Sequence, residues 1–187
     1  GAELAVDRFG KGNSAYYFDG HGSFIVIPNS PMLNPSNRTI SAWVKLDITS
    51  RYMDIVSKDG ESYERQYILN YISGDDKGHF RVHIGRANET LHYFNSNTRP
   101  SAGSWYFLAQ TWDGTMLKLF VNGEYDKPES TRVADGGVTH SSQPVRIGGG
   151  APERNSPYWF AGTIDEVRIY SRALSESEIL DLFIQGD

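Results

Sequence analysis

The sequence predicts an all-β fold, a sandwich of two antiparallel sheets with one short helix near the C-terminal end. Short runs of alternating apolar and polar residues recur along the whole chain, and 19 glycines and 8 prolines are spread between them. Turn residues at such spacing are typical of many short strands joined by hairpins and loops. No long helical crossover separates the runs, which disfavours a parallel sheet.

The predicted strands are residues 14–18, 23–27, 38–46, 52–57, 66–72, 79–84, 91–94, 105–112, 115–121, 124–126, 145–147, 158–160 and 163–170. Asp-Gly at residues 113–114 and Asn-Gly at residues 122–123 lie between apolar runs. These dipeptides favour tight hairpin turns, so three consecutive antiparallel strands are expected there. The helix is predicted to begin at a capping box of Ser175 and Glu178 and to end at Gly186.

Length and composition bound the class of protein. The 187 residues are expected to form a single domain, residues 1–187, and the isolated domain is expected to be monomeric. A net charge of −5 without a basic cluster argues against nucleic acid as a partner. There is no cysteine, and no apolar run approaches the roughly 20 residues of a membrane span, so membrane insertion is not expected. Because the sequence begins at Gly1, we expect any export signal to lie outside it.

The last predicted strand raises a specific question about Asp165. Strict alternation over residues 163–170 places Asp165 on one face with Val167 and Ile169, and Glu166 on the other face. A carboxylate that faces a core costs several kcal/mol unless it is paired, hydrogen-bonded or bound to a metal. The sequence leaves three partners open: a metal ion, loop amides or an arginine.

Three stretches together resemble the laminin-G-like domains of the concanavalin A-like jelly-roll superfamily, which is related to pentraxins. They are AYYFDGHGSFIVIP at residues 15–28, SWYFLAQTWDGTMLKLFVNGE at residues 104–124 and FAGTIDEVRIYSRALSESEI at residues 160–179. Their order and spacing match the family over nearly the whole chain. The resemblance implies a jelly roll whose first and last strands lie together. It also implies a non-catalytic module of a larger secreted or cell-surface protein, hence an extracellular or cell-surface location.

The resemblance further implies one structural calcium ion. In the family, the aspartates of the F-D-G turn and of I-D-E-V approach the ion together with backbone carbonyls. Carried over, the metal residues are Asp19, Gly20 and Asp165. This chain departs from the pattern at residues 21–23, His-Gly-Ser, where relatives often carry an acid.

A glycosidase is disfavoured, because related jelly-roll glucanases place their catalytic acids on one strand as E-x-D-x-x-E. No such string occurs here, and the acidic run at residues 59–64 contains a glycine and is predicted as a turn. We therefore expect no catalytic residues and no enzyme activity.

Carbohydrate binding is the predicted function, with a polysaccharide or glycan as partner and a protein adhesion module as the alternative. A sugar ring offers an apolar face and several hydroxyls, so its site needs exposed aromatic rings beside polar groups. The candidate residues, all in predicted loops or at predicted strand ends, are Tyr52, Tyr63, Arg65, Arg154, Tyr158 and Trp159.

Overall fold

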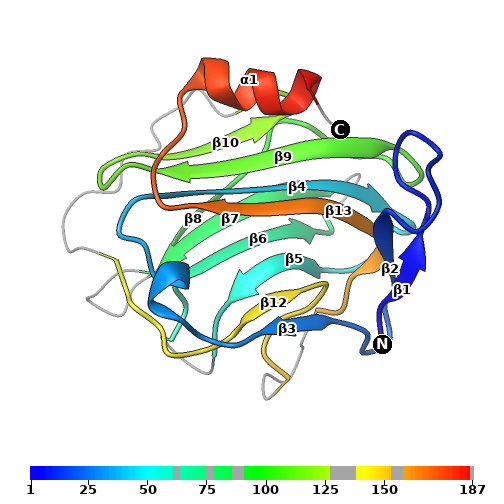
Figure 1. Cartoon of the computed structure of the whole chain (residues 1–187), viewed down its shortest axis with the longest axis horizontal. Coiled ribbons are helices and arrows are strands. Elements are labelled where there is room, and N and C mark those ends of the chain that lie inside the picture. Colours follow the sequence, from blue (N-terminus) through cyan, green and yellow to red (C-terminus); the bar gives the residue numbers. More distant parts are fainter. Residues whose placement is uncertain (61–63, 75–77, 86–90, 127–137, 153–157, 186–187) are drawn as a thin grey trace.

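The computed structural model describes residues 1–60, 64–74, 78–85, 91–126, 138–152 and 158–185. These residues form two antiparallel sheets stacked face to face (Figure 1). The seven-stranded sheet contains, in spatial order, β1 (Glu3–Ala5), β2 (Ala15–Asp19), β13 (Ala161–Tyr170), β4 (Arg38–Leu46), β9 (Trp105–Trp112), β10 (Leu117–Val121) and β11 (Glu124–Tyr125). The six-stranded sheet contains β3 (Ile25–Ile27), β12 (Val145–Ile147), β5 (Met53–Lys58), β6 (Tyr67–Ile72), β7 (His79–Gly85) and β8 (Leu91–Asn95).

The predicted two-sheet sandwich is confirmed, and so is the expectation that the first and last parts of the chain lie together. β13 pairs with β2 on one side and with β4 on the other. Three local predictions were wrong or incomplete. Residues 158–160 are not a strand, because Tyr158 adopts a positive φ of 51°, outside the extended region. The short strand β1 and the 3-10 turn η1 (Pro31–Leu33) were not predicted.

The main core lies between the sheets and follows the alternation of the strands. In β6, for example, Tyr67, Leu69 and Tyr71 face this core and are fully buried. No helix in the described part of the chain is long and apolar enough to cross a membrane.

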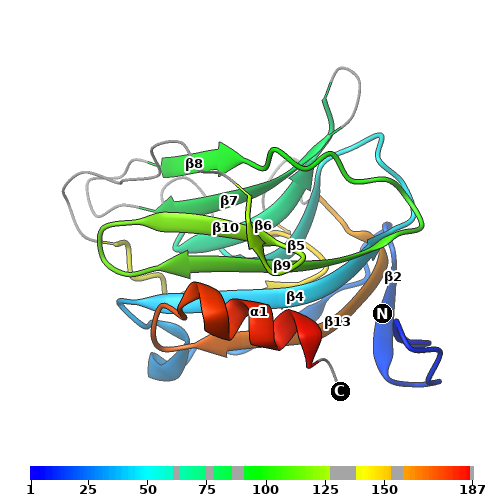
Figure 2. The same cartoon turned by 90° about the horizontal axis from the view of Figure 1, so that it is seen from above.

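A second, smaller cluster lies on the outer face of the seven-stranded sheet, under α1 (Glu176–Ile184) (Figure 2). The predicted capping box is present, because Ser175 and Glu178 bond each other's backbone amides. Phe183 of the helix stacks on Trp43 with ring centroids 5.6 Å apart and lies 6.2 Å from Phe107. The helix therefore covers the middle of the sheet and buries apolar residues on the outer faces of β4 and β9.

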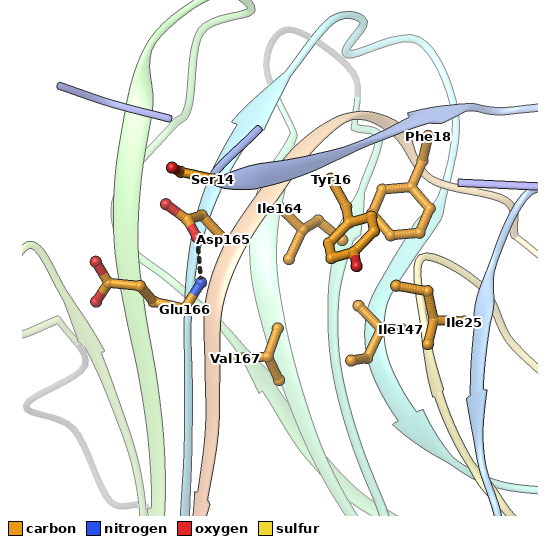
Figure 3. A pocket seen from close by; sticks show the side chains of 9 residues that line it. All are labelled: Ser14, Tyr16, Phe18, Ile25, Ile147, Ile164, Asp165, Glu166 and Val167. Carbon is orange, nitrogen blue, oxygen red and sulfur yellow. Dashed lines mark hydrogen bonds between the residues drawn. The ribbon is translucent and has the colours of Figure 1, made fainter. Parts of the chain in front are cut away.

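The predicted faces of β13 are wrong, because a bulge interrupts its pairing with β4 between Asp165 and Arg168. Glu166 has a positive φ of 48° at this bulge, which adds one residue and reverses the alternation. Ile164, Val167 and Ile169 consequently all pack against the main core. Asp165 instead pairs with Trp43 in register and shares its outer face. Figure 3 shows the Asp165 and Glu166 side chains pointing away from Ile164 and Val167.

Replacing Phe183 by alanine tests the contribution of the helix cap on the sheet. The ring is half-buried against Trp43 and Phe107, so we expect a loss of about 2 kcal/mol in the free energy of unfolding. Ile184→Ala is the matched control, because Ile184 is 68% exposed and should change stability little. Urea denaturation measures both, and equal effects of the two variants would contradict this packing.

Candidate functional site

Three of the predicted sugar-binding residues meet in one pocket of about 460 Å³. Tyr52, Tyr158 and Trp159 come from distant segments, and the pocket is completed by Ser50, Arg51 and Ser73. This volume is within the range of about 300–1,000 Å³ that is usual for small-molecule sites. We call it the Tyr52 pocket.

Strand pairing assembles the Tyr52 pocket at one end of the six-stranded sheet. Residues 50–52 lead into β5, and Ser73 follows its neighbour β6, so the antiparallel pair places them at the same end. Tyr158 and Trp159 lie just before β13. The Asp54 amide donates to the Tyr158 carbonyl at 2.8 Å, which ties this third segment to β5.

The two tyrosines form an angled aromatic surface at the mouth of the Tyr52 pocket. Their ring centroids lie 5.6 Å apart with planes inclined by 59°, and Tyr52 is 41% exposed. The positive φ of Tyr158 costs energy for a residue with a side chain, and such strain is often kept at functional sites. A sugar ring could pack its apolar face on either tyrosine.

Trp159 is held more rigidly than the tyrosines. Its ring is stacked on Phe24 with centroids 5.0 Å apart and planes inclined by only 14°. A Cβ atom on Gly149 would lie 2.5 Å from the tryptophan ring. The ring can therefore occupy this position because residue 149 has no side chain. The indole is a preformed wall of the pocket rather than a mobile side chain.

Arg51 belongs to the Tyr52 pocket but was not among the predicted residues. It donates from Nη2 to the Gly20 carbonyl at 2.8 Å. Its position next to Tyr52 in the sequence was the only available signal, because the contact with Gly20 depends on the fold.

The other predicted sugar-binding residues are not brought to this pocket or lie outside the described residues. Tyr63 and Arg154 fall in segments that the structure does not describe. Arg65 lies beyond the other end of β6, where its backbone carbonyl closely approaches Gly85. The structure therefore does not place Arg65 beside Tyr52.

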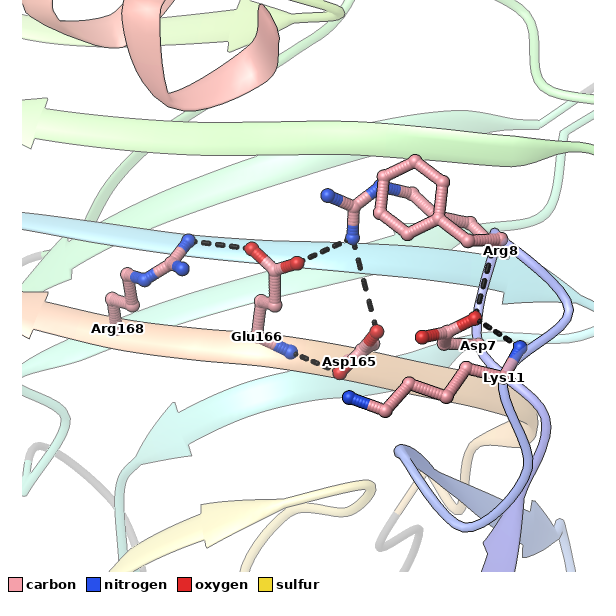
Figure 4. Close-up of polar contacts among 7 residues, drawn as sticks. Asp7, Arg8, Lys11, Asp165, Glu166 and Arg168 are labelled. Carbon is pink, nitrogen blue, oxygen red and sulfur yellow. Dashed lines mark hydrogen bonds and ion pairs between the residues drawn. The ribbon is translucent and has the colours of Figure 1, made fainter. Parts of the chain in front are cut away.

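The partner of Asp165 in this structure is an arginine from the N-terminal loop (Figure 4). Arg8 Nη1 lies 3.8 Å from Asp165 Oδ2 and bonds Glu166 Oε1 at 2.5 Å. Arg168 bonds the other oxygen of Glu166 at 2.6 Å. Of the three partners that the sequence left open, the structure shows an arginine and, for Oδ1, the Glu166 amide at 2.8 Å.

Arg8 is packed as tightly as a core residue. Its guanidinium carbon lies 4.2 Å from the ring centroid of Trp43 and 4.2 Å from that of Phe9, and its side chain is 7% exposed. The loop that carries it is held by Asp7, whose Oδ1 accepts from the Phe9 and Lys11 amides. The N-terminal loop thus fastens onto β13 and β4 through one buried cation.

Burial raises the pKa of Asp165 above its ordinary value of 3.8. The neighbouring carboxylates of Glu166 and Asp7 act in the same direction, whereas the Glu166 amide and Arg8 oppose them. Arg8 compensates Asp165 only in part because its short bond goes to Glu166.

The placement of the predicted metal residues does not fit an ion shared by Asp19 and Asp165. Asp19 pairs with Ala161, and Asp165 lies four residues further along β13, or about 13 Å at the usual strand rise. The Asp19 carboxylate accepts from the Ser23 hydroxyl and the His21 amide, which lower its pKa, and the Gly20 carbonyl accepts from Arg51. Among the described residues, no group of three or more His, Cys, Asp or Glu is arranged to hold a metal. Calcium binding itself is not tested by the structure and stays a prediction.

A second pocket, of about 340 Å³, opens beside the bulge of β13. Figure 3 shows its apolar lining, and its residues are Ser14, Tyr16, Phe18, Ile25, Ile147, Ile164, Asp165, Glu166 and Val167. Its Phe18 and aliphatic walls lie beside carboxylates that are already engaged by Arg8 and Arg168, so the Tyr52 pocket is the better candidate.

Asp165→Asn should change stability in a pH-dependent way. Because the folded-state pKa is raised, the ionised carboxylate is unfavourable at neutral pH and is relieved as the pH falls through that pKa towards 3.8. Asparagine resembles the neutral form, so the stability of the variant relative to the wild type should be more favourable at pH 7 than near pH 4. Urea denaturation at both pH values measures this difference, and a lower relative stability at pH 7 would show that Arg8 outweighs burial.

Calcium should not act through Asp19 and Asp165 together. Differential scanning calorimetry on chelator-treated protein, with and without added calcium, compares the wild type with Asp19→Asn and Asp165→Asn. An ion that binds only the folded state raises the melting temperature. We do not expect calcium to raise the melting temperature of the wild type in a way that each of the two substitutions abolishes. Finding such a rise would mean that the two side chains share an ion.

Comparison with known proteins identifies the family to which this fold belongs. A laminin G family model, described as the concanavalin A-like lectin/glucanases superfamily, matches residues 19–180. Human pappalysin-1 is 25% identical over an alignment of 194 residues, gaps included. The alignment covers 96% of this chain but only 12% of that protein. The chain therefore spans about an eighth of the length of this curated relative.

Two solved structures share the fold at low sequence identity. Domain 4 of AbnA, an extracellular arabinanase from Geobacillus stearothermophilus, was solved with arabinotriose; it has a TM-score of 0.70 and 22% identity, over 97% of this chain and 81% of that one. The sialidase module CBM40 of Ruminococcus gnavus, bound to sialyllactose, has a TM-score of 0.68 and 17% identity, over 91% and 96%. The two-sheet sandwich is thus a jelly roll, and the chain belongs to the laminin-G-like group of the concanavalin A-like lectin/glucanase superfamily.

Proposed function

We propose that this chain is a non-catalytic carbohydrate-binding module and that a glycan binds in the Tyr52 pocket. The observation that carries the proposal is the convergence into one pocket of Tyr52 with Tyr158 and Trp159, which come from a second, distant segment. These residues have the chemistry that sugar recognition requires, because the aromatic rings accept the C–H face of a sugar. The hydroxyls of Ser50 and Ser73 and the Arg51 guanidinium can bond its hydroxyl groups.

The fold neighbours support this proposal. The AbnA domain and the CBM40 module were both solved with bound oligosaccharides and share the jelly roll. Each is part of an enzyme that acts on carbohydrate, by its name an arabinanase and a sialidase. By analogy, this chain would be an accessory module of a larger secreted or cell-surface protein. The module would keep that protein bound to its glycan.

The non-catalytic role rests on the residues that line the pocket. Retaining hydrolysis of a glycoside needs two carboxyl groups about 5–5.5 Å apart across the scissile bond. Among the described residues that line the Tyr52 pocket, none carries a carboxylate. Asp165 and Glu166 line the other pocket, and their oxygens are engaged by Arg8 and Arg168.

A protein adhesion module is the second candidate. It is favoured by apolar side chains exposed on the N-terminal segment, where Leu4, Val6 and Phe9 are 57%, 52% and 60% exposed. Exposed apolar side chains that lie close together are typical of surfaces that bind proteins.

Glycan binding by variants of the Tyr52 pocket tests the proposal. On a glycan array, wild-type protein should bind at least one oligosaccharide, and Tyr52→Ala should weaken it about tenfold, since an aromatic contact is worth about 1 kcal/mol beyond its buried area. Gly149→Ala should also weaken binding, because the added methyl group displaces the Trp159 ring although no lining residue is itself replaced.

Tyr16→Ala is the matched control, because Tyr16 is 44% exposed and lies outside the Tyr52 pocket. Melting temperatures of all variants show that lost binding does not reflect lost folding. A clean array with capture of a protein ligand, abolished by Phe9→Ser, would favour adhesion and overturn the sugar proposal.

A further inference from the structure

Among its described lining residues, the Tyr52 pocket contains one cation and no anion to balance it. Arg51 is the only charged side chain among the described residues that line the pocket. In the part of the chain that the structure describes, its only hydrogen bond runs from Nη2 to the Gly20 carbonyl, and it forms no ion pair. A guanidinium carries five N–H donors, so most of its donors are not used by the protein.

The Nε atom of Arg51 is shielded from solvent and has no hydrogen-bond partner in the structure. Because this atom is shielded even from water, a ligand cannot reach it in this conformation, so Nε is not itself a binding group. The donors open to a ligand are those of the terminal Nη atoms, since Nη1 is not among the shielded atoms and Nη2 uses one of its two N–H groups on Gly20. The natural acceptor for these donors is a carboxylate, which takes charge-assisted N–H bonds. Such an acceptor would have to come from the ligand.

The turn after β2 fixes the orientation of this guanidinium. Gly20 has a positive φ of 74°, and a Cβ atom there would lie 2.0 Å from Arg51 Nη2 and 2.8 Å from the Ala161 Cβ. The planar group therefore rests directly on the bare backbone of Gly20. A cation that is positioned before the ligand arrives loses less entropy on binding, which favours affinity and discrimination.

We propose that the Tyr52 pocket selects glycans that carry a carboxylate, which binds the terminal N–H donors of Arg51 while the sugar ring packs on Tyr52 or Tyr158. This inference rests on the proposed function and adds the class of ligand to it. The carboxylate could belong to a uronic acid or to a sialic acid, since both present the same planar group beside a sugar ring.

Isothermal titration calorimetry with matched ligand pairs tests this proposal. One pair is oligogalacturonate and its carboxyl-reduced, neutral counterpart; the other is sialyllactose and lactose. Wild-type protein should bind one acidic member at least about tenfold more tightly than its neutral partner, and the preference should weaken as salt is added. The pair that shows the preference identifies the source of the carboxylate.

Variants of Arg51 separate recognition from a purely structural role. Arg51→Gln should abolish the preference for the acidic member while keeping binding of the neutral member. Arg51→Lys keeps the charge but not the planar fork, so it should retain only part of the preference. Gly20→Ala keeps the arginine but displaces it, and should also reduce the preference. Lys11→Gln, an exposed position in the N-terminal loop, controls for net charge.

The outcomes distinguish the carboxylate proposal from the sugar-binding function on which it rests. Equal affinity of the wild type for acidic and neutral members, or a preference that survives Arg51→Gln, overturns the carboxylate proposal and leaves sugar binding intact. Absence of binding to every glycan overturns both. A lower melting temperature of Arg51→Gln with an unchanged preference would show that Arg51 only supports the Gly20 turn.

Discussion

The seven-stranded sheet depends on the insertion of β13 between β2 and β4. Because it lies near the C-terminal end and pairs with β2 near the N-terminal end, this strand joins the two ends of the chain. The Tyr52 pocket, the N-terminal loop and the helix all adjoin it. Its start follows the Tyr158–Trp159 wall of the Tyr52 pocket, and its bulge presents Asp165 and Glu166 to Arg8. Its end leads into the helix that covers the outer face. The order of the sheet therefore determines both the position of the pocket and the fastening of the N-terminal loop.

The bulge in β13 shows how much one residue can change the chemistry of a strand. Without it, Asp165 would face the core with Val167 and Ile169. With Glu166 in the left-handed region, the three aliphatic side chains stay inside and the two acids turn towards arginines. The cost of one strained residue is thus offset by keeping these two carboxylates out of the main core.

Much of the fold was predictable from the sequence, since it depends on local patterns. The boundaries of β4 and β9 follow directly from alternation, and the capping box of α1 from Ser175 and Glu178. The bulge was not predictable, because Glu166 carries no glycine-like signal for a positive φ. Of the site, sequence reasoning found the aromatic residues by type but not their grouping, and it missed Arg51 and Arg8, whose roles come from contacts with distant segments.

The central position of β13 also bears on how this protein is made. Among the described strands of this domain, β2 and β4 leave the ribosome early, whereas β13, which must lie between them, emerges last. Until then both strands present unpaired edges, which are prone to join other chains. Pairing between opposite ends of a chain is also slow to form. This domain therefore remains incomplete during synthesis, and in need of protection from aggregation, until β13 has emerged.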